Sequence, residues 1–191
     1  MPPSLRIGLS SWIIQDGNYG DFAVGRQYAF ALEFWPLEPL AVRHPDAAAA
    51  SLSMQWEHDE VYSIKGKVSF IAASWWVLDT GIPMYLERNN PPGPVGTPVR
   101  GQIGISIDHF SYFESLAREA GAPALIFDWR VDAIEMDTAP CVETKPRHFE
   151  RDRTRQGWRS LRHTDAWTDD NEKADYVLTC SRIPGDPRHQ R

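Results

Sequence analysis

Apolar and polar side chains alternate along several short stretches of this chain. In residues 99–108, for example, Val99, Ile103 and Ile107 share one face, while polar side chains occupy the other. Successive side chains of a strand point to opposite faces, so this period of two predicts strands with one buried side. The same pattern, with interruptions, covers residues 5–14, 26–35, 61–73, 75–88, 124–136 and 174–183. The chain is therefore predicted to be mainly β.

The period changes once to that of a helix, between residues 110 and 120. Apolar residues recur there at helical spacing, at Phe113, Leu116, Ala117 and Ala120. Ser111 and Glu114 have the spacing of a capping box, and Gly121 suits the position after the last turn. One short helix near 110–120 is predicted.

From about residue 61 the predicted order is β-β-β-α-β-β, which is the element order of an OB-fold. Gly66 interrupts the first of these strands and indicates a bulge or a bend. We therefore expect a small OB-like or related β-barrel over residues 61–185. Residues 1–60 would form an N-terminal β-hairpin extension packed on the barrel, and residues 186–191 a disordered tail. Another small barrel or a two-layer sandwich would also fit.

Two adjacent tryptophans, Trp75 and Trp76, raise the first question of function. On a strand they point to opposite sides, so we expect one to join Trp12 and Trp129 in the core. The other would be an outward platform, since stacking on such a ring contributes about 1–3 kcal/mol per base in single-strand binding proteins. The binding face would also carry Tyr85, Arg88 and Arg100. The alternative is that residues 1–60 cover this face.

Charge is unevenly distributed along the 191 residues, whose net charge is −6. Residues 1–144 carry a net −9, residues 145–162 a net +5 and residues 163–191 a net −2. The overall sign disfavours a general nucleic-acid binder, because a polyanion would be repelled. The basic segment is a local exception on an acidic protein.

This basic segment mixes arginines with aromatic residues, a composition that suits phosphate contact together with stacking. Its predicted partner-binding residues are Arg151, Arg153, Arg155 and Trp158. It falls between the last two predicted strands, in a connection that binds ligands in OB-folds. Alternatively, it docks on the acidic surface of the protein itself or forms a solvated loop.

Candidate catalytic groups are few and lack a specific spacing. Asp108 and His109 are adjacent, His163 and Asp165 lie two apart, and residues 57–60 read Glu-His-Asp-Glu. Such groups bind metals or transfer protons when they are brought together, but no HExxH, paired CxxC, GxSxG, P-loop or GxGxxG motif occurs. We predict no catalytic residue, no metal and no cofactor.

The two cysteines, Cys141 and Cys180, are expected to be buried free thiols, although a bridge is possible. No signal peptide or apolar span is recognisable, so a cytoplasmic location is the expectation. The sequence favours a non-catalytic binding module whose partner is a protein rather than a nucleic acid. The alternative is a small β-barrel enzyme or ligand binder with an aromatic-lined pocket, with an acid such as Asp79 or Glu33 inside.

Overall fold

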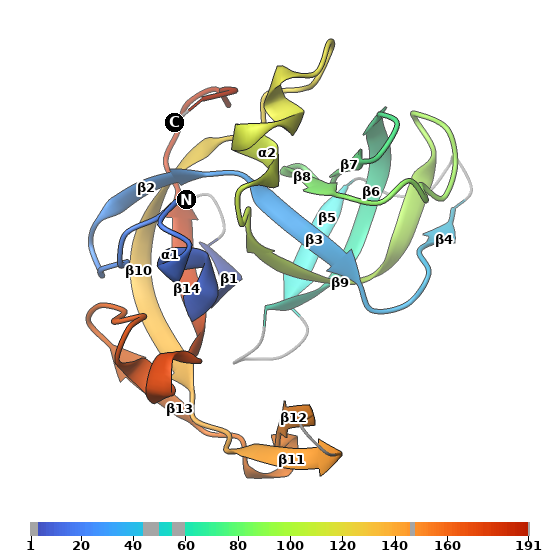
Figure 1. The fold of residues 1–191 in the computed structure, drawn as a ribbon. Coiled ribbons are helices and arrows are strands. Elements are labelled where there is room, and N and C mark those ends of the chain that lie inside the picture. The colour runs from blue at the N-terminus through green and yellow to red at the C-terminus, as the bar shows by residue number, and fades with distance from the viewer. Residues whose placement is uncertain (1–3, 44–49, 55–59, 146–147, 191) are drawn as a thin grey trace.

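The protein is described by a computed structural model that covers residues 4–43, 50–54, 60–145 and 148–190. Two curved β-structures lie side by side (Figure 1). The first is built from β3 (Leu32–Pro36), β4 (Ala41–Val42), β5 (Ser51–Met54), β6 (Val61–Ile71), β7 (Trp76–Asp79), β8 (Pro83–Leu86) and β9 (Pro98–Ile107). The second is built from β1 (Ser4–Ser10), β2 (Gln27–Phe30), β10 (Phe127–Asp137), β13 (Trp158–Leu161) and β14 (Asp175–Arg182).

Five strands of the first structure close into a barrel, as a small-barrel fold requires. The ring runs β3-β9-β6-β7-β8 and returns to β3. Four contacts are antiparallel, and the closing contact is parallel, with Glu33 beside Tyr85. The prediction of a mainly β protein with a small barrel and one short helix near 110–120 is confirmed.

Side chains fill the barrel interior. The inward set includes Phe34, Val68, Leu78, Met84 and Ile103, all fully buried in one contiguous core. Phe34 meets the ring of Trp76 edge to face, with 5.1 Å between ring centroids. Removing apolar surface from water contributes about 25 cal/mol per Å² to the free energy of folding, so this core is a main source of stability.

Gly66, where the sequence predicts a bulge or a bend, lies instead in close contact with the neighbouring strand. A Cβ atom there would lie only 2.7 Å from the backbone oxygen of Asp79, so no larger residue fits without a shift. The strand itself continues through Gly66, and the register shift between β6 and β7 comes just after it, between Val68 and Phe70. The glycine therefore permits tight packing of β6 on β7.

The second β-structure is an antiparallel sheet in the order β13-β10-β14-β1, with β2 beside β10. Its core stacks Phe30 on Trp129, with 5.6 Å between ring centroids. It meets the barrel at a parallel bridge between Gly8 of β1 and Ser106 of β9, and the Tyr62 hydroxyl of β6 hydrogen-bonds the backbone N–H and oxygen of Arg6 in β1. These contacts place the two curved structures against each other.

The strand pairings differ from the hairpin extension expected at the N-terminus. β1 pairs with β14 rather than with β2, and residues 11–15 turn into helix α1 (Ser11–Gln15) instead of continuing as a strand. β3, which precedes residue 61, belongs to the barrel ring, whereas β10 and β14 belong to the second sheet. Local periodicity located the strands, but it did not predict which strands pair across long stretches of the sequence.

Helix α2 (Ser111–Glu114) and the 3₁₀ turn η1 (Leu116–Arg118) occupy the predicted helical segment. The predicted capping box is not formed, because the N-cap residue of α2 is Phe110 and no side chain caps the helix there. Gly121 has a φ of 79°, the left-handed conformation expected after the last turn. α2 lies above the end of the barrel (Figure 1).

The remaining elements lie near the C-terminus. They are β11 (Cys141–Lys145), β12 (His148–Arg151), η2 (Arg153–Arg155) and η3 (Asp169–Glu172). β11 and β12 form a separate hairpin beyond the second sheet (Figure 1). The prediction of a disordered tail from residue 186 is wrong for the described residues. Arg188 pairs with Ile126 through two backbone hydrogen bonds, and its guanidinium donates twice to Asp128 at 2.7 Å.

Candidate functional site

The Trp75–Trp76 pair points to opposite sides of the chain, as predicted, but neither ring is an outward platform. Trp76 lies in the barrel core, and Trp75 lies in a second apolar cluster with Tyr85, Tyr112 and Leu116. Both rings are at most 2% exposed. The cover comes mainly from the α2 segment, with Ala29 and Ala31 as a contribution from residues 1–60. Glu119 accepts a hydrogen bond from Trp75 Nε1 at 3.0 Å.

Tyr85 is also buried, so it offers no surface to a partner. Its hydroxyl donates to Asp108 Oδ1 at 2.6 Å, and the backbone N–H of Tyr112 donates to the same oxygen at 3.1 Å. Burial raises the pKa of Asp108 above its ordinary value, and these hydrogen bonds oppose the shift. The group ties β8, β9 and α2 together at the end of the barrel.

Arg88 and Arg100 are exposed, but they lie in separate shallow hollows. Arg88 follows β8 and lines a hollow beside Pro36 and Trp76, whereas Arg100 on β9 lines another with Ser63 and Lys65. The structure therefore does not bring these two arginines together with Trp75 and Tyr85.

One arginine of the basic segment, Arg151, is docked on the protein itself. The Arg151 side chain donates to Asp175 at 2.8 Å and to Asp170 at 2.9 Å, and it also bonds the backbone oxygens of Ala139 and Lys173. Arg155 is exposed, and the side chain of Arg153 lies outside the described residues. Arg151 thus holds the β11–β12 hairpin to the start of β14 and to the segment just before it.

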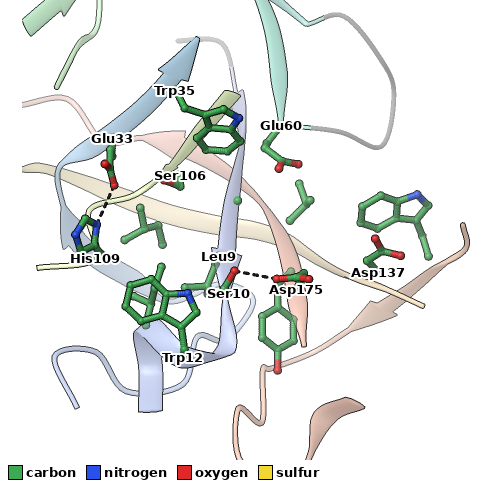
Figure 2. A pocket seen from close by; sticks show the side chains of 16 residues that line it. Leu9, Ser10, Trp12, Glu33, Trp35, Glu60, Ser106, His109, Asp137 and Asp175 are labelled. Atoms are coloured by element: carbon green, nitrogen blue, oxygen red, sulfur yellow. Dashed lines mark hydrogen bonds and ion pairs between the residues drawn. The ribbon is translucent and has the colours of Figure 1, made fainter. Parts of the chain in front are cut away.

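A cleft of about 400 Å³ opens where β1 meets β9, between the barrel and the second sheet. Figure 2 shows its lining, with Trp35 and Trp12 at opposite ends of the view. One side carries Glu33 and His109, and the other carries Glu60, Asp137 and Asp175. Its volume falls within the usual range of ligand pockets, about 300–1,000 Å³.

Tryptophans form the apolar walls of this cleft. Trp12, expected in the core, is instead 49% exposed, because α1 turns it out of the second sheet. Trp35 is 38% exposed and lies over Gly104, where an added Cβ would come within 2.1 Å of the indole ring. Trp158, a predicted binding residue, is half-buried and lines the same cleft.

The polar lining of the cleft is acidic. Glu33, Glu60, Asp137 and Asp175 contribute carboxylates, and no lysine or arginine among the described residues lines it. Arg151 offsets the charge of Asp175 from outside the cleft, and the Ser10 hydroxyl donates to the same carboxylate at 2.8 Å. The charged side chains in the described lining are therefore carboxylates, with His109 as the basic group among them.

His109 is the one histidine among the described residues of this lining, and both of its ring nitrogens are hydrogen-bonded. Nδ1 lies 2.9 Å from Glu33 Oε2, and Nε2 lies 3.1 Å from the Ser111 hydroxyl. The hydrogen bond to Glu33 raises the pKa of His109, while partial burial lowers it to a lesser extent. The ring also contacts Trp12, with centroids 5.8 Å apart.

The Ser111–His109–Glu33 arrangement has the order of groups found in acyl-transfer triads. In such a triad the serine oxygen must reach the substrate. Here Ser111 is 9% exposed and is absent from the lining, so the cleft reaches His109 and Glu33 but not the hydroxyl. The arrangement fixes the imidazole ring and does not present a nucleophile.

The other groups noted in the sequence lie apart from the cleft or outside the described residues. Among the described residues no cluster of three or more His, Cys, Asp or Glu side chains is arranged to hold a metal. Residues 57–59 lie outside the described part of the chain. Cys141 is exposed on β11 and Cys180 is buried on β14, both as free thiols. No helix among the described residues is long and apolar enough to span a membrane.

Most cleft residues were missed by sequence reasoning. Trp12 was assigned to the core and Glu33 to a barrel interior, while Trp35 was not singled out. The local signals were Trp158 in the basic segment, the pair Asp108–His109, and the run of residues 57–60 that ends in Glu60; the last two were noted without a distinctive spacing. Because the lining comes from strands far apart in sequence, their joint position depends on tertiary structure.

The comparisons with known proteins leave the function to be argued from this geometry. No protein-family model, no curated protein and no solved structure matches the chain.

Proposed function

We propose that this protein is a non-catalytic binding module that recognises a partner protein through the cleft between its barrel and its second sheet. The observation that carries the proposal is the pair of partly exposed tryptophans, Trp12 and Trp35, on the walls of an open cleft. Tryptophan is enriched among the residues that dominate the energy of protein interfaces. The net charge of −6 favours a protein partner over a nucleic acid.

The filled barrel supports this proposal over a ligand enclosed in the barrel. Phe34, Val68 and Ile103 occupy the interior where such a ligand would lie. Neither acid considered for an interior pocket is there: Glu33 faces the cleft, and Asp79 accepts a hydrogen bond from Gly81 at the β7–β8 turn. Within the proposal the barrel is an OB-like scaffold, and a reducing, cytoplasmic location is in keeping with the two free thiols.

Affinity capture with cleft variants tests the proposed function. The full-length protein, Trp12→Ala and Trp35→Ala would be used as baits in extract from the cells that produce it. Trp167→Ala is the matched control, because Trp167 is 59% exposed and lies outside the cleft lining. We expect a protein retained by wild type and by the Trp167 variant to be lost from both cleft variants, before and after nuclease treatment.

Two outcomes would contradict the proposal. Capture that is equal for all four baits would place the contact away from the cleft. Capture that nuclease abolishes would identify the partner as a nucleic acid. Circular dichroism of each variant checks that a loss of capture does not come from unfolding.

A further inference from the structure

The outer face of β9 leads from the cleft to a pair of basic residues on the barrel. We propose that this pair, Lys65 and Arg100, binds a carboxylate of the partner protein, on a segment that also contacts Trp35 in the cleft. This inference rests on the proposed function and adds an acidic residue to the description of the partner. It is carried by two adjacent like charges and by their continuity with the cleft.

The first argument is the register of the two strands. Lys65 of β6 and Arg100 of β9 lie directly opposite each other in an antiparallel pairing. Both side chains are exposed, and neither forms a hydrogen bond or an ion pair with another described residue. Like charges directly opposite each other in a sheet are destabilising, and a bound anion would remove that repulsion.

The cross-strand neighbours of the pair do not supply a negative charge. On the same face of the sheet, in the adjoining positions of the register, these neighbours are Ala41, Ser51, Ser63, Lys67, Pro98 and Gln102. None of them is acidic, and Lys67 lies 3.8 Å from a carboxylate of its own, that of Asp79. A carboxylate of the partner would therefore meet two cations without displacing an existing ion pair.

Lys65 and Arg100 line a shallow hollow of about 460 Å³ on the outside of the barrel. Glu38 is the one carboxylate in its described lining, and it also lines the separate hollow that holds Arg88. Glu38 is exposed and forms no ion pair with either cation of the pair. The hollow thus has two cations for one carboxylate, which favours the entry of an anion.

The second argument is that the hollow and the cleft lie on one face of β9. Alternate residues of a strand share a face, so Ser106 in the cleft and Arg100 in the hollow lie on the same side of the sheet. Trp35, on the cleft wall in Figure 2, lies over Gly104 between them. At about 3.3 Å per residue, Gly104 and Arg100 are roughly 13 Å apart along the strand. An extended partner segment along β9 would therefore carry its carboxylate about four residues from the residue that contacts Trp35.

A protein carboxylate fits this hollow better than a nucleic acid does. The guanidinium of Arg100 presents paired N–H donors that match the two oxygens of a carboxylate. Proteins that bind single strands stack the bases on aromatic rings, and the described lining of the hollow has no aromatic side chain. The net charge of −6 also repels a polyanion.

A matched pair of peptides tests the charge requirement. Acetyl-Tyr-Thr-Ser-Thr-Glu-amide would be titrated into the ¹⁵N-labelled full-length protein at low salt, and the same peptide ending in glutamine would be its neutral counterpart. We expect the backbone N–H signals of Lys65, Arg100 and Gln102 to shift, together with the indole N–H signal of Trp35. The dissociation constant should lie on the order of 1–10 mM for the glutamate peptide and be at least about fivefold higher for the glutamine peptide.

Neutralising variants then connect the peptide to the pair. Lys65→Gln and Arg100→Gln should each weaken binding of the glutamate peptide by about threefold to fivefold, and the double variant should bind the two peptides equally. Because each substitution also removes a like-charge contact, neither should lower the unfolding temperature. Arg26→Gln, which alters an exposed arginine next to β2, is the matched control and should leave the affinity unchanged.

Four results would overturn the inference: equal affinity for the two peptides, no shift at about 20 mM glutamate peptide, an effect of Arg26→Gln as large as that of Arg100→Gln, or tighter binding of a short oligothymidylate at Lys65 and Arg100. The last result would identify the site as one for phosphate. If the peptides fail while Trp12→Ala and Trp35→Ala still lose the captured protein, the proposed function stands and only this inference falls. If those cleft variants retain the captured protein, the proposed function falls whatever the peptides show.

Discussion

Two pairs of tryptophans in this protein have opposite environments. Trp76, at the start of β7, and Trp75, just before it, are buried in separate apolar clusters, whereas Trp12 and Trp35 are partly exposed on the walls of the cleft. The sequence predicts that one ring of the first pair is exposed, because neighbouring side chains on a strand point to opposite faces and cannot both enter one core. The comparison shows that the cover supplied by other segments, rather than the face a residue occupies, decides which tryptophans can meet a partner.

The largest effect should distinguish buried from exposed tryptophan directly. Trp76→Ala removes a ring packed against Phe34 and should lower the free energy of unfolding by about 3–5 kcal/mol. Trp12→Ala removes a ring that is 49% exposed and should cost less than about 1 kcal/mol. Urea denaturation followed by circular dichroism measures both, and equal losses would contradict the assigned environments.

The arginines allow the same comparison at a smaller scale. Arg151→Gln removes hydrogen bonds to Asp170 and Asp175 and should destabilise the protein by about 2 kcal/mol. Arg155→Gln alters an exposed side chain and should change stability by less than about 0.5 kcal/mol. Chemical denaturation of the two variants decides whether this segment is docked, and similar small effects would show that it is not.

Gly104→Ala tests how the cleft holds Trp35. The added Cβ would overlap the indole ring, so the ring must move. It has room to do so because it is only partly covered. We expect a loss of about 1 kcal/mol in unfolding free energy and a clear shift of the Trp35 indole N–H signal. An unchanged Trp35 signal would mean that the ring does not lie over β9.

The smallest expected effect is the pH dependence of His109. Its pKa is raised from 6.5 by Glu33, so the folded state keeps the proton where the unfolded state has lost it. The resulting stability is fully present below about pH 6.5 and is lost as pH rises through the folded-state pKa. Relative to His109→Gln, wild type should gain about 0.5–1 kcal/mol near pH 6 and less at pH 8.5. A stability difference between wild type and His109→Gln that grows with pH would contradict a raised His109 pKa.

Several features of the fold were predictable because they depend on neighbouring residues. Alternation located the strands around residues 61–73 and 99–108, and helical spacing located α2 with its following turn. Partner choice was not predictable: β3 joins β8 and β9, and β1 joins β14, across long stretches of chain. Residues 11–14 read as part of a strand, yet Trp12 lies on α1.

The candidate site depended still more on tertiary structure. Period two correctly separated Trp75 from Trp76, but no local pattern revealed that the α2 segment would cover Trp75. Trp158 was identified among the basic residues, and it lines the cleft while its neighbour Arg151 turns to Asp170 and Asp175. Glu33 and His109 lie 76 positions apart in sequence, so only the closed barrel brings them together.

The most direct test of the account is the solvent exposure of each tryptophan indole, measured from paramagnetic broadening of the N–H signals by a neutral soluble gadolinium chelate. The account predicts strong broadening for Trp12 and Trp35 and little for Trp75 and Trp76. Strong broadening of Trp75 or Trp76 together with protected Trp12 and Trp35 would contradict it, because the accessible aromatic surface would then lie on the barrel and not in the cleft.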